Sequence, residues 1–172
     1  MKLKTQNTLR LISHYPLILL VIFSSYFLYL SYTQYESTLA LKNKIESINV
    51  LSKLSIELAK ERGVSASFYS SQGNIGKDAL LEQRLVVNQA IEEFHTYFQS
   101  HEISPHIKTV MTFLTKLIET RQAIDTISID FHKMFFNYYS QTNAHIIKEI
   151  EGIGSINTNS NISNLTYSLV ML

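Results

Sequence analysis

The apolar and polar positions divide the chain into two parts. Between Arg10 and Glu36 no Asp, Glu, Lys or Arg occurs, and most residues of 17–32 are apolar. With its flanks, this stretch reaches the roughly 20 residues with which a helix crosses the hydrocarbon core of a bilayer. We therefore predict a transmembrane helix over residues 11–33.

The charges around this segment are unevenly distributed. Three cations lie within residues 1–10, and the next one, Lys42, comes well after the apolar stretch. Because positively charged flanks tend to stay in the cytoplasm, we expect residues 1–10 to be cytoplasmic and residues 34–172 to lie outside. Two alternatives remain. One is a cleaved signal peptide, although its core would be long and no small-residue cleavage site follows; the other is a buried core helix.

After residue 34 the apolar residues recur at the three- and four-residue spacing of amphipathic helices. Residues 36–70 carry the first such pattern, with apolar positions at Leu41, Ile45, Ile48, Leu51, Leu54 and Leu58. A turn containing Gly and Asn follows at residues 72–76. The chain has only two Pro and five Gly, which favours long helices over a β fold with many turns.

The pattern beyond this turn predicts helices over residues 78–101, 105–127 and 131–151, a polar loop over 152–163, and the first turns of another helix over 165–172. Asp78 is the expected N-cap of the second helix. Ser104 and Pro105 fit the N-cap and the first position of the third. We therefore predict an all-α fold, in which an N-terminal transmembrane helix is followed by an antiparallel, up-and-down helical bundle.

Composition excludes several classes of function. The 172 residues include no Cys, so disulfides and thiolate metal sites are absent, and the net charge of +1 lacks the basic excess of a nucleic-acid binder. We find no pairing of a nucleophile with a base, no phosphate-binding Gly loop and no metal-ligand spacing. We therefore expect no catalytic residues, no metal, no cofactor and no nucleic-acid partner, and the chain does not read as an enzyme.

Three of the four arginines lie on or beside the apolar stripes of the predicted helices. Arg84 takes the place of an apolar residue between Leu80 and Val87, and Arg121 does so between Leu117 and Ile124. Arg62 follows Leu58 in a looser register, in which the adjacent Glu61 is the alternative stripe position. The lysines supply most of the remaining positive charge.

Arginine on a buried stripe has a specific chemical meaning. Its planar fork of donors stays charged when it is desolvated, and it pairs with planar oxyanions through two hydrogen bonds. Three guanidinium groups that face one interior repel each other unless an anion lies between them. One reading is therefore a small anion held by Arg62, Arg84 and Arg121. In the other interpretation, each arginine pairs with a carboxylate or extends to the surface along its aliphatic stem. The available carboxylates are Glu57, Glu61, Glu82 and Asp125.

Two stretches of the chain resemble the start of the nitrate- and nitrite-sensing (NIT) domain, namely LSKLSIELAKERGVSASFYSSQG and LLEQRLVVNQAIEEF. The later stretches LTKLIETRQAID and FFNYYSQTNAHIIKEI resemble its Leu-x-x-Arg helix and its Tyr-rich helix. The resemblance covers about residues 48–172, and Glu61-Arg62-Gly63 with the following Ser65-Ala66 is its specific part.

The resemblance implies an all-helical domain whose ligand lies among arginines. Arg62 is then the first candidate ligand, and Arg84 and Arg121 match recurring positions of the family. Ser65 could donate a hydrogen bond to the anion, although a bond back to its own helix is the alternative. Gly63 would allow the anion or a neighbouring backbone to approach closely, or would simply mark a packing or kink position.

The family also implies the setting of such a domain. We expect the chain to be the N-terminal portion of a single-pass bacterial sensor in the inner membrane, with its bundle in the periplasm. We expect the family domain to be incomplete at the C-terminus, because its second half does not follow. Nitrate or nitrite, the lipid bilayer and a second copy in a homodimer are the expected partners. The cytoplasmic output, such as a chemoreceptor-like signalling region, is not identified. The alternatives are a non-sensory membrane-anchored bundle for dimerisation or scaffolding, and a bundle sensor for another small ligand.

Overall fold

The computed structural model describes residues 2–101 and 103–155, with side chains from His14 onward. Every element in these residues is a helix, and no strand occurs among them. The predicted all-α class is therefore confirmed. The chain forms two compact units, residues 1–44 and 45–172, and we describe each by itself.

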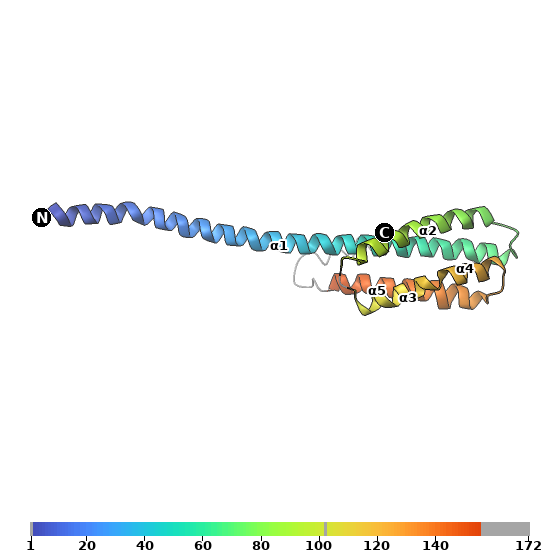
Figure 1. The fold of residues 1–172 in the computed structure, drawn as a ribbon. Coiled ribbons are helices and arrows are strands. Elements are labelled where there is room, and N and C mark those ends of the chain that lie inside the picture. The colour runs from blue at the N-terminus through green and yellow to red at the C-terminus, as the bar shows by residue number, and fades with distance from the viewer. Residues whose placement is uncertain (1, 102, 156–172) are drawn as a thin grey trace. The chain divides into compact units, whose positions relative to one another are not determined.

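The first unit consists of the N-terminal part of helix α1 (Lys2–Ser70) (Figure 1). An 18-residue window of this helix has a mean hydropathy of 1.6, and none of it is buried. By length and composition, α1 is the one helix of the described residues that could cross a membrane. A helix that is apolar all round and buried against nothing is suited to an apolar solvent.

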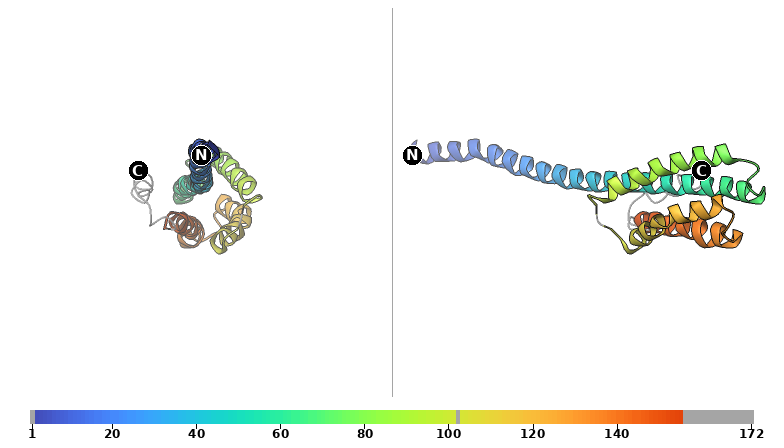
Figure 2. Two further views of the ribbon diagram at one scale, coloured as in Figure 1. Left: turned by 90° about the vertical axis from the view of Figure 1, so that its left-hand side faces the viewer. Right: turned by 45° about the vertical axis from the view of Figure 1, so that its right-hand side comes forward.

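The second unit is a helical bundle. Its elements are the C-terminal part of α1, α2 (Lys77–Phe98), α3 (Pro105–Thr115), α4 (Leu117–Asp125), the π-helix η1 (Lys133–Ser140) and α5 (Gln141–Ser155). In Figures 1 and 2, α2 runs back along α1, α3 and α4 follow in succession, and η1 with α5 completes the bundle. This is the up-and-down arrangement that the short connections predict.

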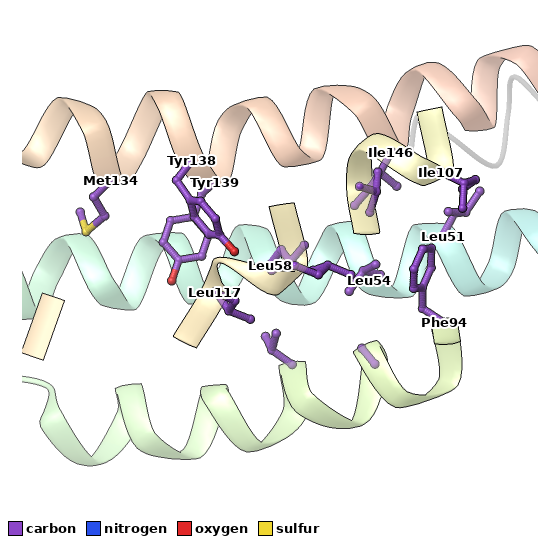
Figure 3. Packing of buried hydrophobic residues seen from close by; sticks show 14 of the residues in the cluster. Leu51, Leu54, Leu58, Phe94, Ile107, Leu117, Met134, Tyr138, Tyr139 and Ile146 are labelled. Carbon is purple, nitrogen blue, oxygen red and sulfur yellow. The ribbon is translucent and has the colours of Figure 1, made fainter. Parts of the chain in front are cut away.

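The core of the bundle combines apolar side chains from all of its helices (Figure 3). Leu51, Leu54 and Leu58 of α1 are fully buried, as the spacing of the first stripe predicts. Ile45, the second position of the predicted stripe, is instead 49% exposed. The buried stripe continues beyond Leu58 to Phe68, so the part of α1 that packs in the core is its C-terminal third.

The predicted helix starts are partly correct. Ser104 is the N-cap of α3, because its hydroxyl accepts a hydrogen bond of 3.1 Å from the backbone N–H of Ile107. The prediction of Asp78 as the N-cap of α2 is wrong. Gly76 takes that position, with a φ of 84°, and Asp78 lies in the first turn. Only glycine adopts this left-handed conformation without strain.

The predicted helix ends differ from the structure. Helix α2 ends at Phe98 and α4 at Asp125, before the predicted ends at residues 101 and 127. The expected third helix is divided at Lys116 into α3 and α4. The last helix continues to Ser155, so the first residues of the predicted loop over 152–163 are helical. The remainder of that loop and the predicted helix over 165–172 lie outside the described residues.

The most informative difference is the π-helix over Lys133–Ser140, where the pattern predicts an ordinary α-helix. The hydroxyl of Ser140 donates a hydrogen bond of 2.7 Å to the carbonyl of Phe135, five residues back. A π turn contains more residues than an α turn. Two consecutive tyrosines, Tyr138 and Tyr139, are therefore both buried, and Figure 3 shows them pointing from η1 into the interior.

Candidate functional site

Glu61 is the centre of a buried polar cluster in the bundle. It lies on the α1 stripe one turn after Leu58, and it is 0% exposed. The stripe position is therefore Glu61, which was the alternative register, and Arg62 points to the adjacent side of α1. Since burial of an unpaired carboxylate is very costly, the neighbouring helices must supply its partners.

Arg121 of α4 is the principal partner of Glu61. Its Nε and Nη2 atoms each lie 2.7 Å from one carboxylate oxygen, which is the bidentate geometry of a strong ion pair. Its Nη1 donates a hydrogen bond of 2.6 Å to the side-chain oxygen of Asn88. Burial lowers the pKa of Arg121, but the hydrogen bonds and the charge of Glu61 outweigh it and leave that pKa raised.

Tyr139 of η1 is the second partner of Glu61. Its hydroxyl donates a hydrogen bond of 2.8 Å to the carboxylate, and the residue is fully buried. Burial, followed by the negative charge of Glu61, raises the pKa of Tyr139 far above its ordinary value. The phenol therefore stays protonated and acts as a permanent donor to the carboxylate.

Arg84 of α2 forms a separate ion pair with Asp125, the last residue of α4. Its two Nη atoms lie 2.9 Å from the two carboxylate oxygens. Its Nε is buried without a hydrogen-bond partner and lies 4.0 Å from a Glu61 oxygen. Arg84 and Arg121 also donate to each other's backbone carbonyls, at 3.3 and 3.4 Å. The two guanidinium groups therefore share one region of the interior.

Arg62 has different surroundings. It is half-buried, it donates one hydrogen bond of 3.0 Å to the hydroxyl of Ser140, and its guanidinium carbon lies 4.6 Å from the centroid of the Phe135 ring. Among the described residues, no carboxylate lies within salt-bridge distance of Arg62. Arg62 is thus the one arginine of the three that has no internal counter-ion in the described part of the chain.

Ser65 lies one turn after Glu61 and is 0% exposed. Burial raises the pKa of Tyr139 and Ser65 acts in the opposite direction, but the Ser65 Oγ has no hydrogen-bond partner among the described residues. The alternative for Ser65, a hydrogen bond back to its own helix, is therefore not found in the described part of the chain. A buried hydroxyl without a partner marks a position where a ligand or a water molecule could be bound.

Gly63 does not have the close neighbour that the sequence suggested. Apart from its chain neighbours and the backbone of its own helix, no atom of the described residues would lie within 4 Å of a Cβ at this position, so the packing of this part of the chain does not require a glycine. Sequence reasoning also missed Tyr139, Phe135 and Ser140. The only signal for them was the aromatic run of residues 131–140, which favours core packing or a dimer contact over a binding surface.

The charges of this region do not cancel. The bundle holds three guanidinium groups (Arg62, Arg84 and Arg121), but the carboxylates paired with them are two, Glu61 with Arg121 and Asp125 with Arg84, so the formal sum is 3 − 2 = +1 and the surplus charge is that of Arg62. One monovalent anion would neutralise it. The described residues contain no group of three or more His, Cys, Asp or Glu side chains suited to a metal ion.

Comparison with known protein families gives a match to one family. The family described as nitrate and nitrite sensing (NIT) matches residues 53–172, which is more than half of the chain and includes all three arginines. No curated protein and no solved structure matches the chain. The chain therefore belongs to the NIT family of nitrate- and nitrite-sensing domains.

Proposed function

We propose that this chain is the membrane-anchored sensory part of a signalling protein, and that it binds nitrate or nitrite through Arg62. Arg84, Arg121 and Ser65 contribute to the same region. The observation that carries the proposal is the state of Arg62, a half-buried guanidinium without a carboxylate partner in the described residues. Such a group favours a bound anion, because a partly desolvated charge without a counter-ion is destabilising.

The surroundings of Arg62 suit a planar anion. The Phe135 ring under the guanidinium and the hydrogen bond to Ser140 restrict its orientation. A guanidinium of fixed plane presents paired N–H donors in the geometry of a planar oxyanion. The surplus charge of +1 favours a monovalent ion, and nitrate and nitrite both satisfy these requirements.

The anchor and the sensory bundle share helix α1. We propose that residues 11–33 cross the bacterial inner membrane, with residues 1–10 in the cytoplasm and residues 34–172 in the periplasm. Transmission then requires the anion to bind one arrangement of the helices more tightly than another. The proposed assembly is a homodimer whose cytoplasmic output belongs to another part of the protein or to a partner, and the chain itself has no enzymatic role.

The test is thermal unfolding of the 172-residue chain in lipid nanodiscs with nitrate, nitrite, chloride or sulfate at matched ionic strength. A specific site gives a saturable increase in Tm with nitrate or nitrite. At a free concentration of about 100 Kd, the increase in unfolding free energy is about 2.7 kcal/mol. Arg62→Ala should abolish this effect. Lys53→Ala removes an exposed cation of the same bundle and should leave the effect intact.

The second candidate function is a non-sensory bundle that dimerises or acts as a scaffold. The ion pairs Arg121–Glu61 and Arg84–Asp125 favour it, since they account for two of the three arginines without any ligand. On this view, the four salts act alike and Arg62→Ala only lowers the stability of the protein. That result would contradict the sensory proposal.

A further inference from the structure

The Arg84–Asp125 pair places a carboxylate on the guanidinium in the geometry that a planar oxyanion would adopt. Both Nη atoms of Arg84 lie 2.9 Å from a carboxylate oxygen. A carboxylate resembles nitrate in its charge, its planarity and its ability to accept two parallel hydrogen bonds. The aspartate therefore occupies a position that an external anion could take on Arg84.

Asp125 is much freer to leave its partner than Glu61 is. The side chain of Asp125 is 49% exposed, whereas that of Glu61 is 0% exposed and also accepts a hydrogen bond from Tyr139. A half-exposed carboxylate that turns away from its partner enters water, and its charge is not left buried. Of the two carboxylates in the cluster, Asp125 is thus the exchangeable one.

A cavity of about 340 Å³ lies beside Asp125, on the side of the carboxylate and not of Arg84. Asp125 lines it together with Ile127 of the next turn, Gly73 of the α1–α2 turn and Lys77 at the start of α2. The cavity is large enough for a small anion, and the Lys77 ammonium favours negative charge there. It offers space both for an entering anion and for a displaced Asp125 side chain.

The turn that follows Asp125 contains a strained residue. Ile127 has a φ of 50°, a left-handed conformation that is unusual for a β-branched side chain. Two backbone hydrogen bonds hold this turn, from Ile127 N–H to Ile124 O and from Ser128 N–H to Ala123 O. Such a conformation persists only while its surroundings maintain it, and the Arg84–Asp125 pair is one link between this turn and α2.

We propose that Asp125 is an internal competitor for the sensed anion. In the anion-free protein its carboxylate occupies Arg84. Nitrate or another planar monovalent oxyanion displaces it, and the displacement releases the C-terminal turn of α4 from α2. The inference rests on the proposed function, since it specifies how the sensed anion gains access to Arg84.

The first test is the affinity of Asp125→Asn for nitrate, measured by calorimetric titration of the full chain in nanodiscs. Loss of the competing charge should strengthen nitrate binding about three- to tenfold, because a partly exposed ion pair favours its closed form by about that factor. The matched control is Glu93→Gln, which removes the carboxylate of another ion pair with 51% exposure and should leave the affinity unchanged. Unchanged or weaker binding in Asp125→Asn would overturn the inference.

The outcomes separate this inference from the proposed function. If the unmodified chain binds nitrate, Arg62→Ala does not, and Asp125→Asn is unchanged, only the competitor role is wrong. Binding that is gained in Asp125→Asn but absent from the unmodified chain supports the competitor role. If neither protein binds nitrate, both proposals are wrong.

A second measurement needs no variant, so it does not depend on whether Asp125→Asn folds. Hydrogen exchange of the Ser128 amide, which donates to Ala123 O, should be faster in nitrate than in chloride at equal ionic strength. The amide of Lys108 donates to Ser104 O at the start of α3, where neither residue lines the cavity, and should be unaffected. Slower or equal exchange at Ser128 in nitrate would contradict the release of the turn.

Discussion

At the scale of single residues, the bundle depends on one buried carboxylate. Glu61 is fully buried, and it receives two hydrogen bonds of 2.7 Å from Arg121 and one of 2.8 Å from Tyr139. These partners come from α4 and η1, so one side chain of α1 joins three helices. Removal of its charge leaves a buried guanidinium without a partner.

The substitution Glu61→Gln should therefore lower the free energy of unfolding by about 3 kcal/mol, as is typical when one partner of a buried pair is removed. Urea denaturation of the full chain in detergent measures the effect. Glu93→Gln, in the exposed pair with Lys53, should cost less than about 1 kcal/mol. An equal loss of unfolding free energy in the two variants would show that the Glu61 charge does not hold the three helices together.

The two buried tyrosines allow a finer comparison. Tyr139→Phe removes a hydrogen bond to a charged acceptor and should cost about 2 kcal/mol of unfolding free energy. Tyr138→Phe removes a bond of 3.0 Å to the backbone carbonyl of Phe113 and should cost about 1 kcal/mol. The same denaturation experiment distinguishes them, and a larger loss at Tyr138 would contradict the central role of Glu61.

At the scale of the elements, the π-helix η1 determines which side chains reach the site. It buries Tyr139 against Glu61 and brings Ser140 and Phe135 to Arg62. A π turn is less favourable than an α turn and is frequent at functional sites. The contacts with α1 offset that cost, so the π turn and the polar cluster stabilise each other.

Two glycines of α1 and its following turn should respond to alanine in opposite directions. Gly63 is helical, exposed and without neighbours within 4 Å in the described residues, so Gly63→Ala should raise the unfolding free energy by about 0.5–1 kcal/mol. Gly73 has a φ of 79°, so Gly73→Ala should lower it by about 1 kcal/mol.

Chemical denaturation of both variants beside the unmodified chain checks this pair of predictions. A destabilised Gly63→Ala would indicate that a partner chain or an undescribed part of this chain packs against that glycine. Loss of nitrate binding without loss of stability would instead support the close approach of the anion.

At the scale of the whole molecule, membrane insertion is the property to be tested. The candidate span and the first helix of the bundle are both parts of α1, and the sequence contains no cysteine. Single cysteines can therefore be introduced as unique labels. Gln89 is an exposed position on α2, and Thr5 lies in the predicted cytoplasmic segment.

We expect a membrane-impermeant maleimide to label Gln89→Cys in intact bacterial cells with a permeable outer membrane. Thr5→Cys should be labelled only after the inner membrane is opened, because the positively charged N-terminus stays in the cytoplasm. The opposite pattern would reverse the proposed topology. Labelling of both sites in intact cells would contradict an uncleaved span with a cytoplasmic N-terminus.

The sequence by itself determined the local features of the structure, which are the buried stripe, the helix start and the apolar segment. The buried positions Leu51, Leu54 and Leu58, the Ser104 N-cap and the apolar segment of α1 follow from residue spacing and composition. These features depend on neighbours within one or two turns, and such neighbours are fixed by the sequence order. The resemblance of Glu61-Arg62-Gly63 to the NIT family likewise required only the sequence.

Only the tertiary structure decided how the charges are paired. Arg121 and Glu61 are 60 positions apart, and Tyr139 and Glu61 are 78 apart, so no local pattern indicates that they meet. The spacing of the stripes allowed either Glu61 or Arg62 to face the core, and packing of α4 and η1 on α1 selected Glu61. The same packing placed Arg62 beside Phe135 and not beside a carboxylate. Pairing between helices depends on contacts between residues far apart in the sequence, and no local pattern predicts these contacts.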